Sequence, residues 1–402
     1  MQNKMTNLPQ GWEVKKLEEI ANIKGGKRLP KGENLLDNNT KFTYIRVADF
    51  QDNGTINLQN IKFINENTYN VLKNYKIYDD NLYISIAGTI GKSGIIPKEL
   101  NGAILTENAV KLEYIQNNIS NKFMYFFTLS NIFKTQIQTS TKIVAQPKLA
   151  ITRLKQIQIP LPPLKEQERI VGILDESFAK IDESIKILEQ NLLNLDELMQ
   201  SALQKAFNPL KDNAKENYKL PQSWEWKSLE EISENISAGG DKPKNCTESK
   251  TAKNQIPVYA NGVNNNGLVG YTDKATIIKP SLTISARGTI GFVCIRKEPY
   301  FPIVRLISLI PCENILCLHY LYFCLNFFIA KGEGSSIPQL TIPKFKSLQI
   351  PLPSLKKQET ITKHLDFIFE KAKALKELYT KELKDYEELK QSLLNKAFKG
   401  EL

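Results

Sequence analysis

Histidine and cysteine are scarce in this chain, which removes most of the side chains that carry catalysis or bind metal. Its 402 residues include two histidines and five cysteines. The cysteines all lie in the second half and form no CxxC pair: Cys246, Cys294, Cys312, Cys317 and Cys324. Cys317 and His319 would point to different faces of a helix, which argues against a zinc site. We therefore expect reduced thiols, no metal and no Ser-His or Cys-His catalysis.

Long apolar runs are also missing. The most apolar stretch, residues 315–330, is shorter than the about 20 residues of a membrane span, and it contains His319 and Asn326. Residues 1–10 contain no apolar run of the kind found in a signal peptide. We therefore expect a soluble, cytoplasmic protein that does not bind membranes.

Acidic residues are fewer than basic ones. The chain has 54 lysines and arginines against 43 aspartates and glutamates, a formal net charge of +11. This balance favours a polyanionic partner, although many unrelated proteins share it.

Two sequence motifs occur twice. The opening motif, LPQGWEVKKLEEI at residues 8–20, returns as LPQSWEWKSLEEI at residues 220–232. The closing motif, IPLPPLKEQE at residues 159–168, returns as IPLPSLKKQE at residues 350–359. A repeat this long is a duplicated domain rather than a solenoid unit. The chain is therefore expected to hold two similar domains in a pseudo-twofold arrangement, which suits a two-part ligand.

The spacing of the repeats separates variable from fixed parts. The segments 164–207 and 355–398 have equal length and end in QSALQKAF and QSLLNKAF, whereas the lengths between the motifs differ. The sequence thus predicts two diverged globular bodies, each followed by an element of fixed length.

The bodies are predicted to be mostly β. Short alternating runs at residues 42–47, 82–87 and 277–284 are separated by turn signals and predict strands. Residues 123–132 and 316–329 are predicted to form helices that pack on the sheets.

The opening motif itself is predicted to lead into an amphipathic helix, because Leu17 and Ile20 have helical spacing and glycines follow. Trp12 and Trp224 are interpreted as core anchors of this segment rather than as platforms for stacked bases.

The period changes after each closing motif. Apolar residues alternate in steps of four and three, the seam of a coiled coil: Ile181, Ile185, Leu188, Leu192, Leu195, Met199 and Ala202. The second copy offers a weaker seam, interrupted by Lys376 and Lys390: Phe369, Ala372, Leu375, Tyr379, Leu383, Tyr386 and Leu393. Neither helix can bury its apolar stripe alone, so mutual antiparallel pairing is predicted. About 40 helical residues would form a rod of about 60 Å.

The resulting fold class is α+β: two tandem mixed, mostly β domains and two long antiparallel coiled-coil helices, with a pseudo-twofold internal repeat. The predicted boundaries are a first domain at 1–163, a central helix at 164–207, a linker at 208–219, a second domain at 220–354 and a C-terminal helix at 355–402.

One motif imitates a nucleotide-binding loop. Residues 87–93, AGTIGKS, approach the P-loop form GxxxxGK[ST], but Ile86 stands where the first glycine belongs and the second copy has no lysine. A tight turn that glycine permits near a sheet edge is the favoured interpretation. We also find no amino-methyltransferase Asn-Pro-Pro-aromatic motif and no nuclease signature, so the chain is predicted to recognise rather than to catalyse.

Together the two opening motifs, the two closing motifs and the two long helices resemble the specificity subunit of type I restriction-modification systems over nearly the whole chain. The resemblance implies that each globular domain is a target-recognition domain reading one half of a bipartite duplex DNA site, and that the helices set the spacer between the halves. It implies docking of two adenine methyltransferase subunits and of translocase/nuclease subunits. S-adenosylmethionine, ATP and Mg would then be cofactors of those partners, with none in this chain.

DNA contacts are predicted among basic and polar residues near the glycine motifs and in the loops between strands. In the first domain these are Lys24, Lys27, Arg28, Lys31, Arg46, Lys92, Ser93, Thr141, Lys142, Gln146 and Lys148. In the second they are Lys242, Lys244, Tyr259, Asn261, Asn264, Arg287, Ser335, Ser336 and Gln339. Two alternatives remain open: a coiled-coil adaptor that binds only protein, its positive charge a solvated face, and an enzyme with an unrecognised site.

Overall fold

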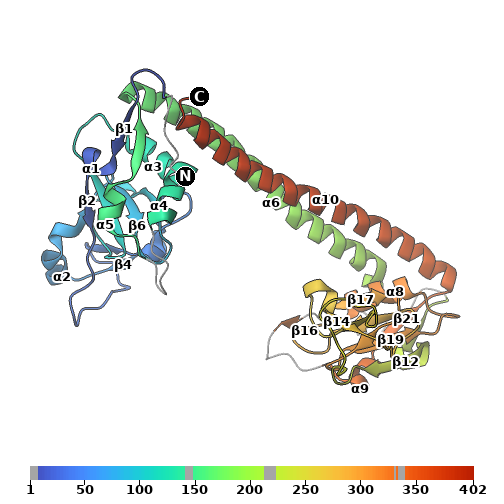
Figure 1. Cartoon of the computed structure of the whole chain (residues 1–402). Coiled ribbons are helices and arrows are strands. Elements are labelled where there is room, and N and C mark those ends of the chain that lie inside the picture. Colours follow the sequence, from blue (N-terminus) through green and yellow to red (C-terminus); the bar gives the residue numbers. More distant parts are fainter. Residues whose placement is uncertain (1–7, 141–147, 212–222, 330–331, 334–339) are drawn as a thin grey trace. The chain divides into compact units, whose positions relative to one another are not determined.

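The computed structural model describes residues 8–140, 148–211, 223–329, 332–333 and 340–402 (Figure 1). Contacts divide the chain into two units. Unit 1 comprises Met1–Leu188 and Lys381–Leu402, and unit 2 comprises Glu189–Thr380. Each unit therefore contains one globular domain and a part of each long helix. No helix within the described residues is both long and apolar enough to cross a membrane.

The first domain, in unit 1, has two sheets. The antiparallel one has the order β2 (Ala21–Gly25), β9 (Ala109–Tyr114), β6 (Leu82–Ser85) and β7 (Ser93–Ile95). The other has the order β4 (Lys62–Phe63), β3 (Thr43–Ile45), β8 (Ala103–Leu105) and β5 (Lys76–Ile77), in which β3 and β8 run parallel. Its helices are α1 (Leu17–Ile20), α2 (Glu66–Val71), α3 (Asn121–Leu129), α4 (Asn131–Ser140) and α5 (Ile151–Lys155).

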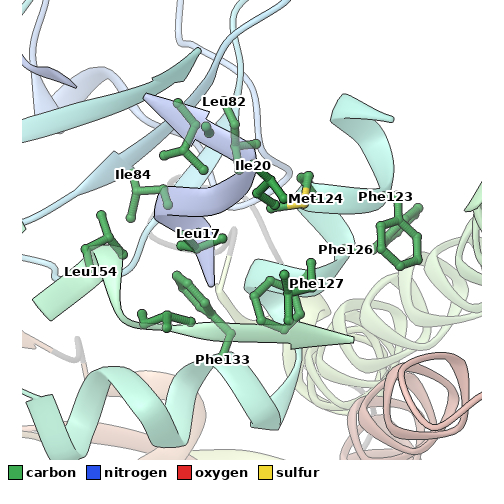
Figure 2. Packing of buried hydrophobic residues seen from close by; sticks show 14 of the residues in the cluster. Leu17, Ile20, Leu82, Ile84, Phe123, Met124, Phe126, Phe127, Phe133 and Leu154 are labelled. Atoms are coloured by element: carbon green, nitrogen blue, oxygen red, sulfur yellow. The ribbon is translucent and has the colours of Figure 1, made fainter. Parts of the chain in front are cut away.

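The core of unit 1 lies between the antiparallel sheet and the helices that cover it. Figure 2 shows side chains of α1, β6, α3 and α5 gathered in one cluster. Helix α3 begins where the Ser120 hydroxyl accepts a hydrogen bond from the backbone N–H of Phe123 (3.3 Å), as an N-cap should. Phe398, just beyond the last long helix, completes the cluster, with ring centroids 5.1 Å from Phe123 and 5.5 Å from Phe127.

The second domain, in unit 2, repeats this plan. Its antiparallel sheet has the order β12 (Ser233–Ala238), β19 (Ile307–Pro311), β15 (Ser281–Ile284) and β17 (Val293–Arg296). A second sheet contains β14 (Leu268–Thr272), β13 (Ile256–Tyr259) and β18 (Phe301–Pro302), and β16 (Thr289–Ile290) pairs with β20 (Gly332–Glu333). Its helices are α7 (Leu229–Ile232), α8 (Leu318–Phe328) and α9 (Ile342–Lys346).

Phe207 plays the same part in unit 2 that Phe398 plays in unit 1. It lies in the second core with Tyr320 at 5.8 Å and Phe327 at 5.6 Å between ring centroids. Each globular core is thus completed by an aromatic residue at the end of a long helix.

Each opening motif pairs with its closing motif. Strand β1 (Glu13–Lys16) is antiparallel to β10 (Gln158–Leu161), and β11 (Glu225–Ser228) is antiparallel to β21 (Gln349–Leu352). The predicted amphipathic helix after the opening motif is therefore wrong in extent, because α1 and α7 are single turns between strands. Leu17, Ile20 and their repeats Leu229 and Ile232 are buried, as their spacing predicted.

Most of the other predicted elements exist with shifted bounds. The strand predicted at 277–284 begins only at Ser281, because Lys279-Pro280 precedes it as a turn. The helix predicted at 123–132 is two helices, since Ser130 ends α3 and its hydroxyl accepts from Phe133 N–H (3.3 Å) at the start of α4. Trp12 and Trp224 pack against the two cores as predicted.

The two long helices are α6 (Leu164–Lys211) and α10 (Leu355–Ala397). They pack against one another in antiparallel sense, with Lys390 paired to Asp182 in unit 1 and Lys376 paired to Asp196 in unit 2. The lysines that interrupt the predicted seam of α10 are therefore contacts between the helices. Helix α6 continues past the predicted end at Phe207 to Lys211, and linker residues 212–219 lie outside the described part.

The seam of α6 is buried at every seventh residue. Exposed fractions rise only to 9% at four heptad positions: Ile181, Leu188, Leu195 and Ala202. The alternate seam positions Ile185, Leu192 and Met199 are half-buried. On α10, Ala372 is buried and the other predicted residues are half-buried, except that Leu375 is 38% exposed, contrary to the prediction. The half-buried neighbour Lys376 takes the inward position there, because it reaches Asp196.

Candidate nucleic-acid interface

The glycine-containing turn at residues 85–93 joins β6 to the edge strand β7. Gly88 and Gly91 have φ of 75° and 89°, the left-handed region that suits glycine. The amides of Ile90, Gly91 and Lys92 donate within the turn, to Gly88 O (3.0 Å), Ser85 O (2.9 Å) and Ser85 Oγ (2.9 Å). These amides are not free to cradle a phosphate, so the tight-turn interpretation is confirmed over the P-loop.

Several predicted contact residues of the first domain are engaged in ion pairs. Lys24 pairs with Glu113 (2.6 Å), Arg28 with Glu107 (2.7 Å) and Lys92 with Asp52 (2.7 Å). The Arg28 side chain is nonetheless 79% exposed. Lys27, Lys31 and Lys148 are exposed.

Two predicted residues of the first domain serve the interior. Arg46 pairs with buried Asp49 (2.5 Å) and donates to the carbonyl of Asn60 (3.0 Å). Ser93 is buried, and its hydroxyl shares a hydrogen bond with that of Thr128 (2.6 Å). Their polar atoms therefore already have partners in the fold.

Some predicted contacts cannot be placed. Thr141, Lys142, Gln146, Ser335, Ser336 and Gln339 lie outside the described residues. For all predicted DNA-contact residues, the contact itself stays a prediction.

In the second domain Lys242, Lys244, Asn264 and Arg287 are exposed. Asn261 is half-buried and ties two loops together: its Nδ2 donates to Val304 O (2.6 Å), and its Oδ1 accepts from Ala286 N–H (2.8 Å).

Tyr259 leads to a residue that the sequence prediction missed. The guanidinium carbon of Arg296 lies 3.5 Å from the centre of the Tyr259 ring, a cation–π contact. Arg296 is 8% exposed and donates to Thr283 Oγ1 (3.0 Å) and Asn266 O (2.5 Å). It thereby holds the exposed segment 263–266 between β13 and β14.

A signal for Arg296 was present in the repeat. The hairpins β6–β7 and β15–β17 pair in the same register, Leu82 with Ile95 and Leu282 with Ile295. The next residue is buried Ile96 in the first copy and Arg296 in the second. A charged residue at a position that is apolar in the other copy indicates that the two domains differ here, either in function or in how the neighbouring loop is held.

Each long helix is locked to its own globular domain by a buried glutamine of the closing motif. Gln167 Oε1 accepts from Ser120 N–H (2.8 Å), and its Nε2 donates to Asn118 O (3.1 Å) and Pro162 O (2.9 Å). The side chain is 1% exposed, and all its hydrogen-bonding groups are used.

The second copy repeats this lock. Gln358, which is fully buried, accepts from Cys317 N–H (2.8 Å) and donates to Ile315 O (2.9 Å) and Pro353 O (2.8 Å). In both units the glutamine fixes the start of the long helix to the loop before the main helix of the domain, α3 or α8.

Comparison with known proteins decides the family. Residues 9–193 and 221–384, most of the chain, match the family described as type I restriction modification DNA specificity domain. The chain belongs to this family. The predicted resemblance is confirmed, and nothing in the comparisons supports a protein-only adaptor.

Proteins described as type I specificity subunits are similar to this chain along most of their length. A putative type I specificity subunit of Mycoplasma pneumoniae is 30% identical over 360 residues, 88% of each chain. A putative type I restriction enzyme specificity subunit of Methanocaldococcus jannaschii is 24% identical over 420 residues, 98% of this chain and 94% of that one.

Solved structures share the fold. One similar chain comes from a study of complex assembly and conformational transition of the type I R-M system, and it has a TM-score of 0.80 at 20% identity. The match covers 98% of this chain and 100% of that one. The HsdS subunit from Thermoanaerobacter tengcongensis has a TM-score of 0.59 at 20% identity over the whole of both chains. The predicted α+β class, with two mixed domains and paired long helices, is confirmed.

Proposed function

We propose that this chain is the DNA-reading subunit of a type I restriction-modification complex, and that each globular domain reads one half of a bipartite duplex site. The observation that carries the proposal is a duplicated scaffold with different surface residues. The two domains share sheet order, hairpin register and the buried glutamine lock, yet differ in the turn of that hairpin, where half-buried Ala87 corresponds to exposed Arg287. A repeated scaffold with changed loops is what two readers of different sequences need.

The long helices set the spacer in this proposal. Each is one continuous helix, the seam of α6 is buried at every seventh residue, and the first turn of each helix contains a glutamine that is locked into its domain. A flexible tether would not hold a fixed register on DNA, whereas paired helices resist bending and twisting.

The same helices offer docking surfaces for two methyltransferase subunits. Apolar side chains stand exposed on them, away from the buried seam: Ile187, Leu193, Leu198, Phe367, Leu378 and Leu389. Exposed apolar residues along a helix commonly mark protein contacts. S-adenosylmethionine, ATP and Mg would be cofactors of the methyltransferase and translocase/nuclease partners, where the chemistry would also take place.

Mapping N6-methyladenine across a genome tests the proposal. A strain carrying this chain with its methyltransferase should gain methylation at one motif of two short specified blocks around an unspecified gap. The same strain lacking this chain is the control. A single continuous motif, or methylation without any motif, would contradict the proposal.

The spacer role has a sharper test. One heptad inserted between Leu188 and Met199, with seven matching residues in the facing part of α10, should lengthen the gap and leave both blocks unchanged. Altered blocks around an unchanged gap would refute the spacer role while leaving DNA reading intact.

A further inference from the structure

A corner of the first domain is built where three segments meet. Gly26 N–H donates to Ala109 O (2.9 Å), and Thr106 N–H donates to Ile45 O (3.0 Å). These bonds bring residues 106–108, between β8 and β9, beside residues 26–28 at the end of β2. At this corner the Arg28 side chain pairs with Glu107.

The second domain builds the same corner with the same backbone bonds. Gly239 N–H donates to Leu306 O (2.8 Å), and Ile303 N–H donates to Tyr259 O (2.8 Å). The sheet register agrees, because Ile84 faces Val110 in the first copy and Ile284 faces Ile307 in the second. Residues 303–305 therefore correspond to 106–108.

The side chains at the corner have been replaced. Glu107 corresponds to Val304, Asn108 to Arg305, and the exposed cation Arg28 to Asp241. A basic side chain is thus offered from the β2 side in the first domain and from the β18–β19 side in the second. The corner is kept, and its exposed chemistry differs between the two readers.

The second corner also has an unusual backbone. Val304 and Arg305 have φ of 54° and 59°, and no non-glycine residue described in the first domain has a positive φ. For a β-branched residue this conformation is a strained outlier. Strain of this kind persists only where neighbouring contacts impose it, and it concentrates at functional positions.

Three hydrogen bonds impose it here. Val304 N–H and Arg305 N–H donate to Gly240 O and Gly239 O (both 2.8 Å), and Asn261 Nδ2 donates to Val304 O. Asn261 also accepts a hydrogen bond from Ala286 N–H. It therefore fixes Val304 and Arg305 relative to the turn between β15 and β17, which begins just before Ala286. The Arg305 side chain, exposed, has no hydrogen bond or ion pair among the described residues.

We propose that Arg305 is a specificity-determining residue that reads a guanine in the half-site of the second domain, and that Asn261 is the residue that positions it. The inference rests on the proposed function and deepens it. An arginine fork matches the O6 and N7 acceptors of guanine in the major groove. A contact to a phosphate tolerates a mobile side chain on a relaxed backbone. Base reading requires a Cα position and a side-chain direction that do not vary, and the strained backbone fixes both.

The experiment compares Arg305→Ala with wild type in the complete methyltransferase complex, by methylation mapping and by binding to duplexes that vary each base pair. Arg305→Ala should lose discrimination at one G·C pair of one block, by roughly 10- to 100-fold, and leave the other block unchanged. Lys274→Ala removes an exposed cation of the same domain that is not among the predicted contacts; it is the control and should not change base preference.

Two results would overturn the inference. One is weaker binding to every sequence with a reduced salt slope, which would make Arg305 a phosphate contact. The other is unchanged discrimination. A wild-type complex with no split motif would instead refute the proposed function, so the two failures are distinguishable.

Val304→Gly tests the positioning. Glycine accepts a positive φ, so the melting temperature should be kept or raised. Discrimination at the same G·C pair should nonetheless fall, because the backbone is released. A stable Val304→Gly variant with full discrimination would show that the strained backbone does not position Arg305. Asn261→Ala should relax the same pair and no other.

Discussion

At the scale of single residues, the most consequential side chains are those that are buried and polar. Gln167 and Gln358 use every hydrogen-bonding group to hold a helix start against a domain. Surface cations are easy to suspect from sequence, but Arg46 is drawn inward by buried Asp49. Supporting residues such as these decide the geometry that exposed residues then use.

Replacing the glutamine lock should loosen unit 1. Gln167→Leu keeps the volume but leaves Ser120 N–H and two carbonyls without partners, so the free energy of unfolding should fall by about 2–4 kcal/mol. Gln156→Leu is the matched control, because Gln156 is exposed and, among the described residues, its side chain bonds only exposed Glu18; its effect should stay below about 0.5 kcal/mol. Urea denaturation measures both, and equal effects would contradict the lock.

Acid should weaken the first domain through Glu113. Partial burial raises the pKa of Glu113, but hydrogen bonds from Lys111 and Lys24 outweigh it, and the pKa ends below its ordinary value of 4.5. A lowered folded-state pKa gives stability that is present above about 4.5 and is lost as the pH falls through the folded pKa. Glu113→Gln should therefore destabilise most near neutral pH and least in acid. Thermal melts across pH measure the difference; a constant difference would disprove the linkage.

At the scale of elements, the long helices show how far sequence patterns reach. The four-three spacing predicted the buried heptad positions of α6, because a period of seven has few structural alternatives. It failed at Leu375, since one-dimensional spacing cannot show that Lys376 reaches Asp196 on the facing helix. The β1–β10 ladder was beyond prediction for a similar reason: it pairs segments that are far apart in sequence.

Prediction of the candidate interface was limited in the same way. Exposed lysines such as Lys242 could be suspected from charge and loop signals. Arg305, the proposed base-reading residue, was not among the predicted contacts, because nothing in the local sequence shows a left-handed backbone at Val304, which depends on Gly239, Gly240 and Asn261. Conformations imposed by tertiary contacts leave no local pattern.

Adjacent residues of α6 provide a matched test of the seam. Leu188 and Ile187 both lie in unit 1. The side chain of Leu188 is buried in the seam at 7% exposed, whereas that of Ile187 faces solvent at 55% exposed. Leu188→Ala should lower the free energy of unfolding by about 2–3 kcal/mol, and Ile187→Ala by less than about 0.5 kcal/mol. Chemical denaturation followed by circular dichroism measures both, and similar losses would argue against a buried seam.

At the scale of the whole molecule, the two cores depend on aromatic residues near the C-terminal ends of the long helices. Phe398 closes the core of unit 1 and Phe207 closes that of unit 2, each within a cluster of aromatic rings. The stability of each globular domain is therefore tied to the end of a helix that lies outside the interval between its own opening and closing motifs.

Each phenylalanine should matter to its own unit. Phe398→Ala should lower the free energy of unfolding of unit 1, and Phe207→Ala that of unit 2, each by about 3–5 kcal/mol. Both rings are buried, and removing either one leaves a cavity in the core. Hydrogen exchange resolved by residue assigns the loss to one unit. Exposed Lys399→Ala serves as the control. Loss of protection spread equally over both units would contradict separate cores.

The shared ending of the two helices bears on how such proteins acquire new sites. Both cores are sealed by the same Lys-Ala-Phe tripeptide, at residues 205–207 and 396–398. If a globular domain is exchanged by cuts at its opening and closing motifs, the tripeptide that enters its core stays in the host chain. The incoming domain must then accept that phenylalanine in its own core. We therefore expect a globular domain taken from a relative to fold in this chain wherever its core accepts that phenylalanine ring.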